Sequence, residues 1–281
     1  MPVTSTGEIV AAAIAAGSGA GAFNVIGIEH AEAIVAGAQV AGRPVVLQIS
    51  ENCVSYHGGL EPVALAALAI ARAATVPVSV HLDHATSQEL VREAAGLGIG
   101  SVMFDASALD YEENVRVTAE LTAWCHERGI WMEAELGEIG GKDGVHAPGA
   151  RTSPEDAAAY VAATGVDGLA VAVGSSHAML SRDAVLDFDL IGRIRDRVPA
   201  AVPLVLHGSS GVADASLTKA IVAGMTKINI ATQLNKVYTA AVRDRLAADE
   251  RLVDPRKYGA AGRDAVAAEV TRLLGVLQVA S

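Results

Sequence analysis

The sequence has few aromatic residues and an excess of acidic over basic ones. Aromatic residues make up 4% of its 281 positions, whereas hydrophobic residues make up 51%. Small and aliphatic side chains must therefore form the core, which suits helices packed on a parallel sheet. Lysine and arginine number 21 against 32 acidic residues, for a formal net charge of -11, and no basic stripe is present. We therefore expect no nucleic-acid partner.

Cysteines and long apolar runs are also scarce. The two cysteines, Cys53 and Cys125, have neither CxxC nor metal-site spacing, which indicates a reducing compartment. No stretch reaches the roughly 18 continuous apolar residues of a membrane span. The first five residues lack the basic and then apolar pattern of a signal peptide. We expect a cytoplasmic protein with no membrane partner.

Short apolar segments alternate along the chain with segments of helical periodicity. Alternating units of this kind form a parallel sheet, either doubly wound or closed. Eight units, without a glycine-rich dinucleotide motif after the first strand, favour a closed (β/α)8 TIM barrel. The predicted strands are Ala22–Ile26, Pro44–Ile49, Val76–Leu82, Gly100–Phe104, Ile130–Glu135, Gly168–Val173, Val202–Leu206 and Thr226–Ile230.

Helices are expected between the strands and at both ends of the chain. An N-terminal helix over Ser5–Ala16 begins with a capping pattern, and a C-terminal helix is expected over Arg263–Leu277. No linker or repeat divides the sequence, so we expect residues 1–281 to form a single domain. The longest irregular segment, Gly137–Thr152, follows the fifth strand and is a candidate loop over the barrel mouth.

Three predicted strands lead into histidines. His84 ends the third strand, His177 follows the sixth and His207 ends the seventh. Because the carboxyl ends of barrel strands converge on one face, these side chains could surround one ion. Three protein ligands leave a coordination position open, as in catalytic zinc sites. A single histidine is more often a hydrogen-bonded core residue, but three at strand ends favour a metal site.

Acidic residues accompany these histidines. Asp83 precedes His84 and is placed either to move protons near a bound substrate or to orient a histidine. Asp105 and Glu135 end the fourth and fifth strands, where they would support the metal ligands or offer an alternative metal position. His81 shares a side of its strand with Asp83 but lies deeper, so we expect a supporting role.

A candidate anion site follows the seventh and eighth strands. Residues His207 to Gly211 read His-Gly-Ser-Ser-Gly, which offers backbone amides and hydroxyls, and Asn229 to Thr232 lead into a helix N-terminus. TIM barrels often hold a phosphate at this corner. The glycine and serine run alone would more often be a turn, but its pairing with the strand-eight residues favours a phosphate site.

The ordered motifs resemble the class II, metal-dependent ketose-bisphosphate aldolases over nearly the whole chain. The similar segments are Gly21–Val25, His81–His84, Ser101–Ser107, Glu133–Gly137, Gly174–His177, Leu206–Gly211 and Lys227–Thr232. The resemblance implies that His84, His177 and His207 bind Zn2+ or another divalent metal, and it leaves room for a monovalent cation. It implies that Asp83 is the general acid and base, with acids near the metal at Asp105 and Glu135.

The resemblance also implies the substrate contacts and the reaction. The residues implied to contact substrate or phosphate are Asn24, Ser50, Gly174, Gly208, Ser210, Asn229 and Thr232. The expected reaction cleaves a ketose (bis)phosphate to dihydroxyacetone (phosphate) and a three-carbon aldehyde. This cleavage leaves an enediolate, whose negative charge a metal can disperse as a Lewis acid. The resemblance further implies a homodimer or homotetramer that acts on a small sugar.

Departures from the family pattern lie around the substrate. Ala178 follows His177 where glycine is usual, Lys142 stands where an acid is common, and Glu51 to Cys53 replace a more glycine-like stretch. These changes keep open a variant substrate, such as a sulfonated ketose or a deoxy keto-gluconate phosphate, whose distal anion Lys142 or Arg151 would meet. The default substrates are fructose and tagatose 1,6-bisphosphate.

Two other classes of protein remain as alternatives. A metal-dependent barrel hydrolase or isomerase could use the same histidines and Asp83. It would need an activated water, and it would have no need for a phosphate corner. A non-catalytic sugar-phosphate binder would have no need for a proton-transfer acid beside a metal. The sequence therefore favours an aldolase.

Overall fold

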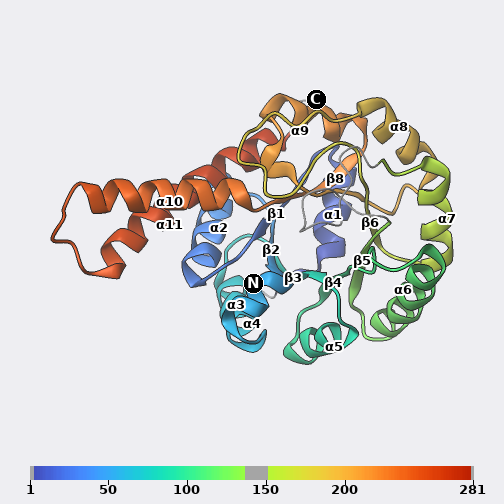
Figure 1. The fold of residues 1–281 in the computed structure, drawn as a ribbon, viewed down its shortest axis with the longest axis horizontal. Helices are drawn as coiled ribbons and strands as arrows, with labels where there is room; N and C mark the ends of the chain where they lie inside the picture. Colours follow the sequence, from blue (N-terminus) through green and yellow to red (C-terminus); the bar gives the residue numbers. More distant parts are fainter. Residues whose placement is uncertain (1–2, 137–150, 280–281) are drawn as a thin grey trace.

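The computed structural model describes residues 3–136 and 151–279, which form a closed barrel surrounded by helices (Figure 1). The strand order is β1-β2-β3-β4-β5-β6-β7-β8, and β8 pairs with β1 to close the ring. Neighbouring strands are parallel throughout, as in the pairing of β2 with β3. The predicted (β/α)8 TIM barrel, with further helices near both ends of the chain, is confirmed.

All eight predicted strands are present, with shifted bounds. They are β1 Ala20–Asn24, β2 Val45–Ser50, β3 Val78–Ala85, β4 Ser101–Phe104, β5 Trp131–Glu135, β6 Gly168–Ala170, β7 Leu204–Leu206 and β8 Met225–Ile230. The largest differences concern β3, which continues three residues past the predicted end, and β6, which stops three residues before it. His84 is the second-last residue of β3, so it lies at the carboxyl end of this strand, as predicted, with one further residue after it.

Helices connect the strands on the outside of the barrel. They are α1 Thr6–Ala15, α2 Ile28–Ala41, α3 Glu51–His57, α4 Glu61–Ala73, α5 Gln88–Leu97, α6 Tyr111–His126, α7 Pro154–Thr164, α8 Phe188–Arg197, α9 Asp214–Ala223, α10 Thr232–Ala247 and α11 Pro255–Val276, with a short 3-10 helix over Ser209–Gly211. The capping pattern before α1 is confirmed, because Ser5 and Glu8 cap each other reciprocally. The C-terminal helix begins at Pro255, eight residues before the predicted Arg263.

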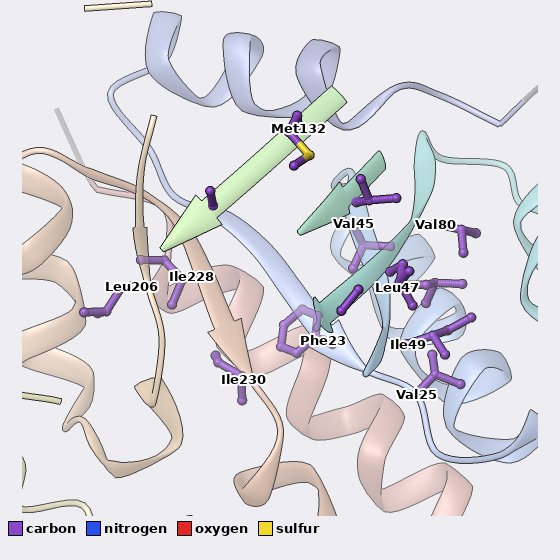
Figure 2. Packing of buried hydrophobic residues seen from close by; sticks show 14 of the residues in the cluster. Phe23, Val25, Val45, Leu47, Ile49, Val80, Met132, Leu206, Ile228 and Ile230 are labelled. Carbon is purple, nitrogen blue, oxygen red and sulfur yellow. The ribbon is translucent and has the colours of Figure 1, made fainter. Parts of the chain in front are cut away.

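Alternation along each strand separates an apolar outer face from a more polar inner one. In β2, Val45, Leu47 and Ile49 belong to the main apolar core between barrel and helices (Figure 2). Gln48 and Ser50 alternate with them, so they face the barrel interior. Because of this alternation, polar side chains lie inside the barrel near the carboxyl ends of the strands.

Helix α1 closes the opposite end of the barrel. Its Ile9, Val10 and Ala13 form a separate apolar cluster with inward-facing residues at the start of the barrel, among them Ala22 and Val46. This plug leaves the carboxyl ends of the strands as the open end. In the described part of the chain, no single helix is long and apolar enough to span a membrane, and only α3 and α4 together, bent by 115°, match such a span in length and composition.

The last two helices form a long hairpin. Helices α10 and α11 lie side by side and extend well beyond the barrel (Figure 1). Thr232, at the start of α10, remains at the barrel mouth, so this hairpin begins at the predicted phosphate corner.

Candidate active site

A cavity of about 650 Å³ opens at the carboxyl ends of the strands. It collects residues that follow or end six different strands and lie far apart in the sequence. Its lining residues are Asn24, Ser50, Glu51, Asn52, Ser55, Asp83, His84, Thr86, His177, Ala178, His207, Gly208, Ser210, Asn229, Ala231 and Thr232. Most residues that the sequence predicts for the site therefore meet in one place.

The three predicted histidines face one another in this cavity. Their ring centroids lie 4.6 Å apart for His84 and His207, 5.2 Å for His84 and His177, and 5.6 Å for His177 and His207. The rings are steeply inclined, at 74° to 86°, so they approach edge to face. Each offers a ring nitrogen within 4.8 Å of those of the other two.

Two of these rings are oriented by carboxylates. His84 Nδ1 lies 2.9 Å from Asp105 Oδ2, and His207 Nε2 lies 3.0 Å from Glu133 Oε1. Because an ionised carboxylate only accepts hydrogen bonds, these two nitrogens carry the N–H in the neutral rings. A carboxylate behind each histidine is the usual support of a metal ligand.

The other nitrogens of the same two rings fit a metal ion. His84 Nε2 and His207 Nδ1 lie 2.9 Å apart. With both N–H groups engaged by carboxylates, two lone pairs face each other, which is unfavourable unless a cation lies beside them. In a tetrahedral zinc site, ligand nitrogens about 2.0–2.1 Å from the ion are roughly 3.3 Å apart. The three histidines therefore suit zinc, and His84, Asp105 and Glu135 form a second group that could hold an ion.

A bulge in β3 brings His84 into the site beside Asp83. Leu82 pairs with Val102 and Ala85 with Phe104, so three steps along β3 match two along β4. The extra residue is accommodated by His84, whose φ is 53°. In a regular strand, consecutive side chains point to opposite faces. The bulge allows Asp83 and His84 both to line the cavity.

Asp83 is buried, yet the pKa of its carboxyl group is lowered. One carboxylate oxygen accepts a hydrogen bond from the Asn24 side-chain amide at 3.3 Å. Burial alone would raise the pKa of Asp83, but the nearby His84, His207 and Lys227 and the Asn24 hydrogen bond outweigh it, so the pKa lies below its usual value. Asp83 is therefore an ionised base before it receives a proton.

A buried ion pair lies beneath the histidines. Lys227 Nζ is 2.9 Å from Glu133 Oε2 and donates to Asn229 Oδ1 at 3.0 Å. Glu133 thus connects Lys227 to His207, and Lys227 connects Glu133 to an asparagine of the cavity wall. His81 is fully buried beside them, 2.6 Å from Ser101 Oγ, and burial holds its pKa well below the usual value.

The predicted phosphate corner is assembled around Ser210. Its Oγ accepts hydrogen bonds from the backbone N–H groups of Ala231 and Gln233, each at 3.1 Å, at the start of α10. The hydroxyl proton is then available for an acceptor in the cavity. Gly208 has a φ of 68°, and a Cβ there would lie 2.5 Å from Ser176 O, so a side chain would not fit this turn.

Some predicted residues lie outside the cavity lining. Asp105 and Glu135 are buried behind the histidines. Gly174 instead allows a close approach of two loop segments, because a Cβ there would lie 2.2 Å from Val185 O. Arg151 is exposed and does not line the cavity, whereas Lys142 lies outside the described residues. Ala178 does line it, with a φ of 57° that glycine would adopt more easily.

Several residues of the site were not predicted as contacts. Glu133 and Lys227 share inward-facing positions with Glu135 and Asn229, so period-two alternation indicates their direction but not their partners. Helix α3, which the sequence pattern does not predict, carries Glu51 and Asn52, two of the departures expected around the substrate, and adds Ser55 to the cavity wall. The sequence feature that could have indicated α3 is Ser50, whose side-chain oxygen caps this helix by accepting a hydrogen bond from Cys53 N.

The fold and the site together define a TIM-barrel enzyme with a three-histidine candidate metal centre and a phosphate corner. The family model of class II fructose-bisphosphate aldolase matches residues 4–281. The chain belongs to this family, and it is an aldolase and therefore a lyase. The family is generally zinc-dependent and acts on small sugar substrates.

Individual relatives agree with this assignment. The chain is 39% identical over 274 residues to a fructose-bisphosphate aldolase from Geobacillus stearothermophilus, covering 96% of this chain and 95% of that protein. It is 37% identical over 270 residues to a fructose-bisphosphate aldolase from Staphylococcus aureus, covering 95% and 94%. Among solved structures, the YdjI aldolase from Escherichia coli K12 superposes with a TM-score of 0.87 at 33% identity, covering 99% and 98%.

Proposed function

We propose that this aldolase cleaves a ketose phosphate to dihydroxyacetone phosphate and an aldehyde, of three carbons when the ketose is a hexose. The observation that carries the proposal is the placement of Asp83 and three histidines beside the Ser210 phosphate corner, in one cavity. A metal-dependent hydrolase could use the same histidines and the same base, but the phosphate corner beside them favours a phosphorylated ketose and a retro-aldol reaction.

His84, His177 and His207 would hold the metal, with Asp105 and Glu133 orienting two of the rings. When bound, a divalent ion would stabilise the negative charge that develops on the ketose oxygens during cleavage. Burial keeps the pKa of His207 well below its usual value, with His84 adding to the effect, so this ring is neutral and suited to bind a cation. Glu135 provides a further carboxylate, with Oε2 3.8 Å from His207 Nδ1.

Asp83 would remove the proton from the C4 hydroxyl during cleavage and return it to the aldehyde oxygen during condensation. The Asn24 amide restrains its carboxylate, and Gln48 in turn donates to Asn24 Oδ1 at 3.3 Å. This chain of hydrogen bonds fixes the base where a substrate hydroxyl can reach it.

The phosphate of the dihydroxyacetone half would bind at the Gly208, Ser210 and Thr232 corner, with Asn229 beside it. Backbone N–H groups and the N-terminus of the 16-residue helix α10 favour an anion there. The helix dipole and the Ser210 hydroxyl would hold the substrate while Asp83 acts across the cavity.

An aldol cleavage assay tests the proposal. We expect chelation with EDTA to abolish triose release from ketose phosphates and zinc to restore it. Release of inorganic phosphate or ketose isomerisation without carbon–carbon cleavage would instead favour a hydrolase or isomerase. Persistence of cleavage after EDTA would contradict the metal requirement. The predicted cytoplasmic location and homodimeric or homotetrameric state are separate proposals, and light scattering tests the second.

A further inference from the structure

We infer that Lys227 is a positioning residue. It holds the side-chain amide of Asn229 so that Nδ2 of this amide donates a hydrogen bond to the phosphorylated half of the substrate. This role rests on the proposed function and belongs to a residue that lies beneath the cavity and does not line it. Two observations support it: the contacts of the Lys227 ammonium group, and a buried amide nitrogen at the cavity that has no acceptor.

Lys227 is enclosed by the barrel. Its side chain and that of Glu133 are both 0% exposed, and Lys227 Nζ lies 2.9 Å from Glu133 Oε2. Nζ also donates to Asn229 Oδ1 at 3.0 Å. Lys227 pairs with Ala20 on β1 and with Val205 on β7, so it stands inside the closed ring of strands. A second copy of the chain therefore cannot supply or replace these contacts.

The ammonium group determines which way the Asn229 amide faces. Lysine has three donors and no acceptor, so only Oδ1 of the amide can face Lys227, and Nδ2 must point away from it. The two residues are two positions apart on β8 and share its inner face, with Asn229 nearer the carboxyl end. Asn229 lines the cavity there, so Nδ2 lies on the side of the amide that the substrate approaches.

This nitrogen needs an acceptor. Asn229 is 7% exposed, and its Nδ2 is buried without a hydrogen-bond partner among residues 3–136 and 151–279. A buried amide N–H without an acceptor is unfavourable. Gly208 and Ser210 line the same cavity. A phosphorylated dihydroxyacetone half bound at this corner has its oxygens beside Asn229, and one of them provides the acceptor.

A second asparagine of the cavity is held in the same way. Gln48 donates to Asn24 Oδ1 at 3.3 Å, and Asn24 Nδ2 donates to Asp83 at 3.3 Å. In both cases a donor from the barrel interior fixes the amide oxygen and leaves the amide nitrogen to donate. The acceptor of Asn24 is a protein carboxylate, whereas that of Asn229 is the substrate. A lysine fixes its amide more strictly than a glutamine does, because only the glutamine could turn and offer an acceptor instead.

The two ends of the buried ion pair should therefore support different functions. Glu133 Oε1 lies 3.0 Å from His207 Nε2, so Glu133 supports a candidate metal ligand. Removing the Lys227 ammonium group leaves the Glu133 carboxylate in place behind His207, so zinc binding should persist. The Asn229 amide, in contrast, loses the donor that fixes its orientation. A residue that only held the interior together would weaken both zinc and substrate binding when it was replaced.

A double-mutant cycle tests this role. Binding of dihydroxyacetone phosphate to the zinc-loaded full chain is measured by calorimetry for wild type, Lys227→Met, Asn229→Ala and the double variant. We expect Lys227→Met to raise Kd by about tenfold, as for one lost hydrogen bond, and to keep the zinc content of wild type. We expect the double variant to bind within about twofold of Asn229→Ala, because Lys227 acts through Asn229. The kcat/KM for ketose phosphate cleavage should follow the same pattern.

Two results would overturn the inference. The first is a tenfold loss that Lys227→Met also causes in the Asn229→Ala background, because the lysine would then act through its charge or through the packing. The second is loss of zinc from Lys227→Met. Lys219→Met makes the same replacement at an exposed position of α9 and should behave as wild type.

A neutral pair covers the case in which Lys227→Met fails to fold because Glu133 loses its partner. Glu133→Gln/Lys227→Met removes both buried charges and is compared with Glu133→Gln, each in excess zinc. We expect the same tenfold difference in Kd, and equal binding would overturn the inference. Wild type that holds zinc but neither binds dihydroxyacetone phosphate nor cleaves a ketose phosphate would instead contradict the proposed function, on which this role depends.

Discussion

The two sides of the cavity are built differently. The histidine side is formed by side chains on or next to the barrel strands, with carboxylates and Lys227 buried behind them. The α3 side is formed by a short helix outside the barrel, whose Glu51 accepts hydrogen bonds from Thr86 on the neighbouring loop. Glu51 and Ala178, where the sequence departs from the pattern that it resembles, both line this cavity. We therefore expect substitutions in the buried interior to affect the reaction itself, and substitutions at the rim to affect the choice of substrate.

The strongest test of the histidine side is His207→Ala. We expect a loss of zinc affinity greater than the roughly 10- to 100-fold that follows removal of a residue supporting a ligand, and loss of cleavage with it. Metal content after dialysis, measured by mass spectrometry, checks this expectation. His126→Ala removes an exposed histidine and is the matched control. Full zinc occupancy in His207→Ala would exclude this residue as a ligand.

Asp83→Asn should separate catalysis from metal binding. We expect zinc content to stay at the wild-type level while kcat falls by roughly 10²- to 10⁴-fold, because an amide cannot accept the substrate proton. Stopped assays of triose release, together with metal analysis, measure both quantities. Near-normal turnover would mean that Asp83 only orients a neighbour.

Glu133→Gln tests the buried support beneath the site. The variant keeps the shape of the side chain but loses the charge that faces His207 and Lys227. We expect zinc affinity to fall by about 10- to 100-fold. Glu113→Gln, at an exposed ion pair with Arg116, should leave zinc affinity unchanged. Equal zinc affinities in both variants would refute the supporting role.

The metal-free protein should lose stability as the pH falls below about 6.5. The pKa values of His81 and His207 lie well below that of an ordinary histidine, chiefly through burial. Below pH 6.5 the unfolded chain binds protons that the folded rings do not, so each contributes up to about 1.4 kcal/mol of lost stability per pH unit. Urea denaturation from pH 7.5 to 5.5 measures the slope, which His81→Asn should reduce. A flat profile would show that the buried rings accept protons without penalty.

Ala178→Gly should give the smallest effect. Glycine relieves the left-handed conformation at φ 57° but adds freedom to the unfolded chain, so we expect the free energy of unfolding to rise by less than about 1 kcal/mol. Thermal denaturation checks the sign. Ala248→Gly, at a φ of -73°, has no strain to relieve and should be destabilising. Destabilisation of similar size in both variants would contradict strain at Ala178.

Much of the site follows from local pattern. The alternation of strands and helices predicts the barrel, and the position of histidines near strand ends predicts that His177 and His207 share one face with His84. The structure brings these residues together as expected. Contacts deeper inside the barrel were less predictable. A strand pattern shows that Glu133 and Lys227 point inward, but it does not show that they form an ion pair.

The sequence alone did not determine the register between neighbouring strands. The alternation of side chains along a strand and the succession of strands and helices along the chain are local properties, so they can be derived from the sequence alone. Which atoms touch depends on how strands are staggered around a closed barrel, and this is a property of all eight strands together. The β3 bulge illustrates the difference: Asp83 and His84 are adjacent in sequence, but only the mismatched pairing with β4 turns both into the cavity. The position of Glu51 likewise depends on Thr86, 35 residues away.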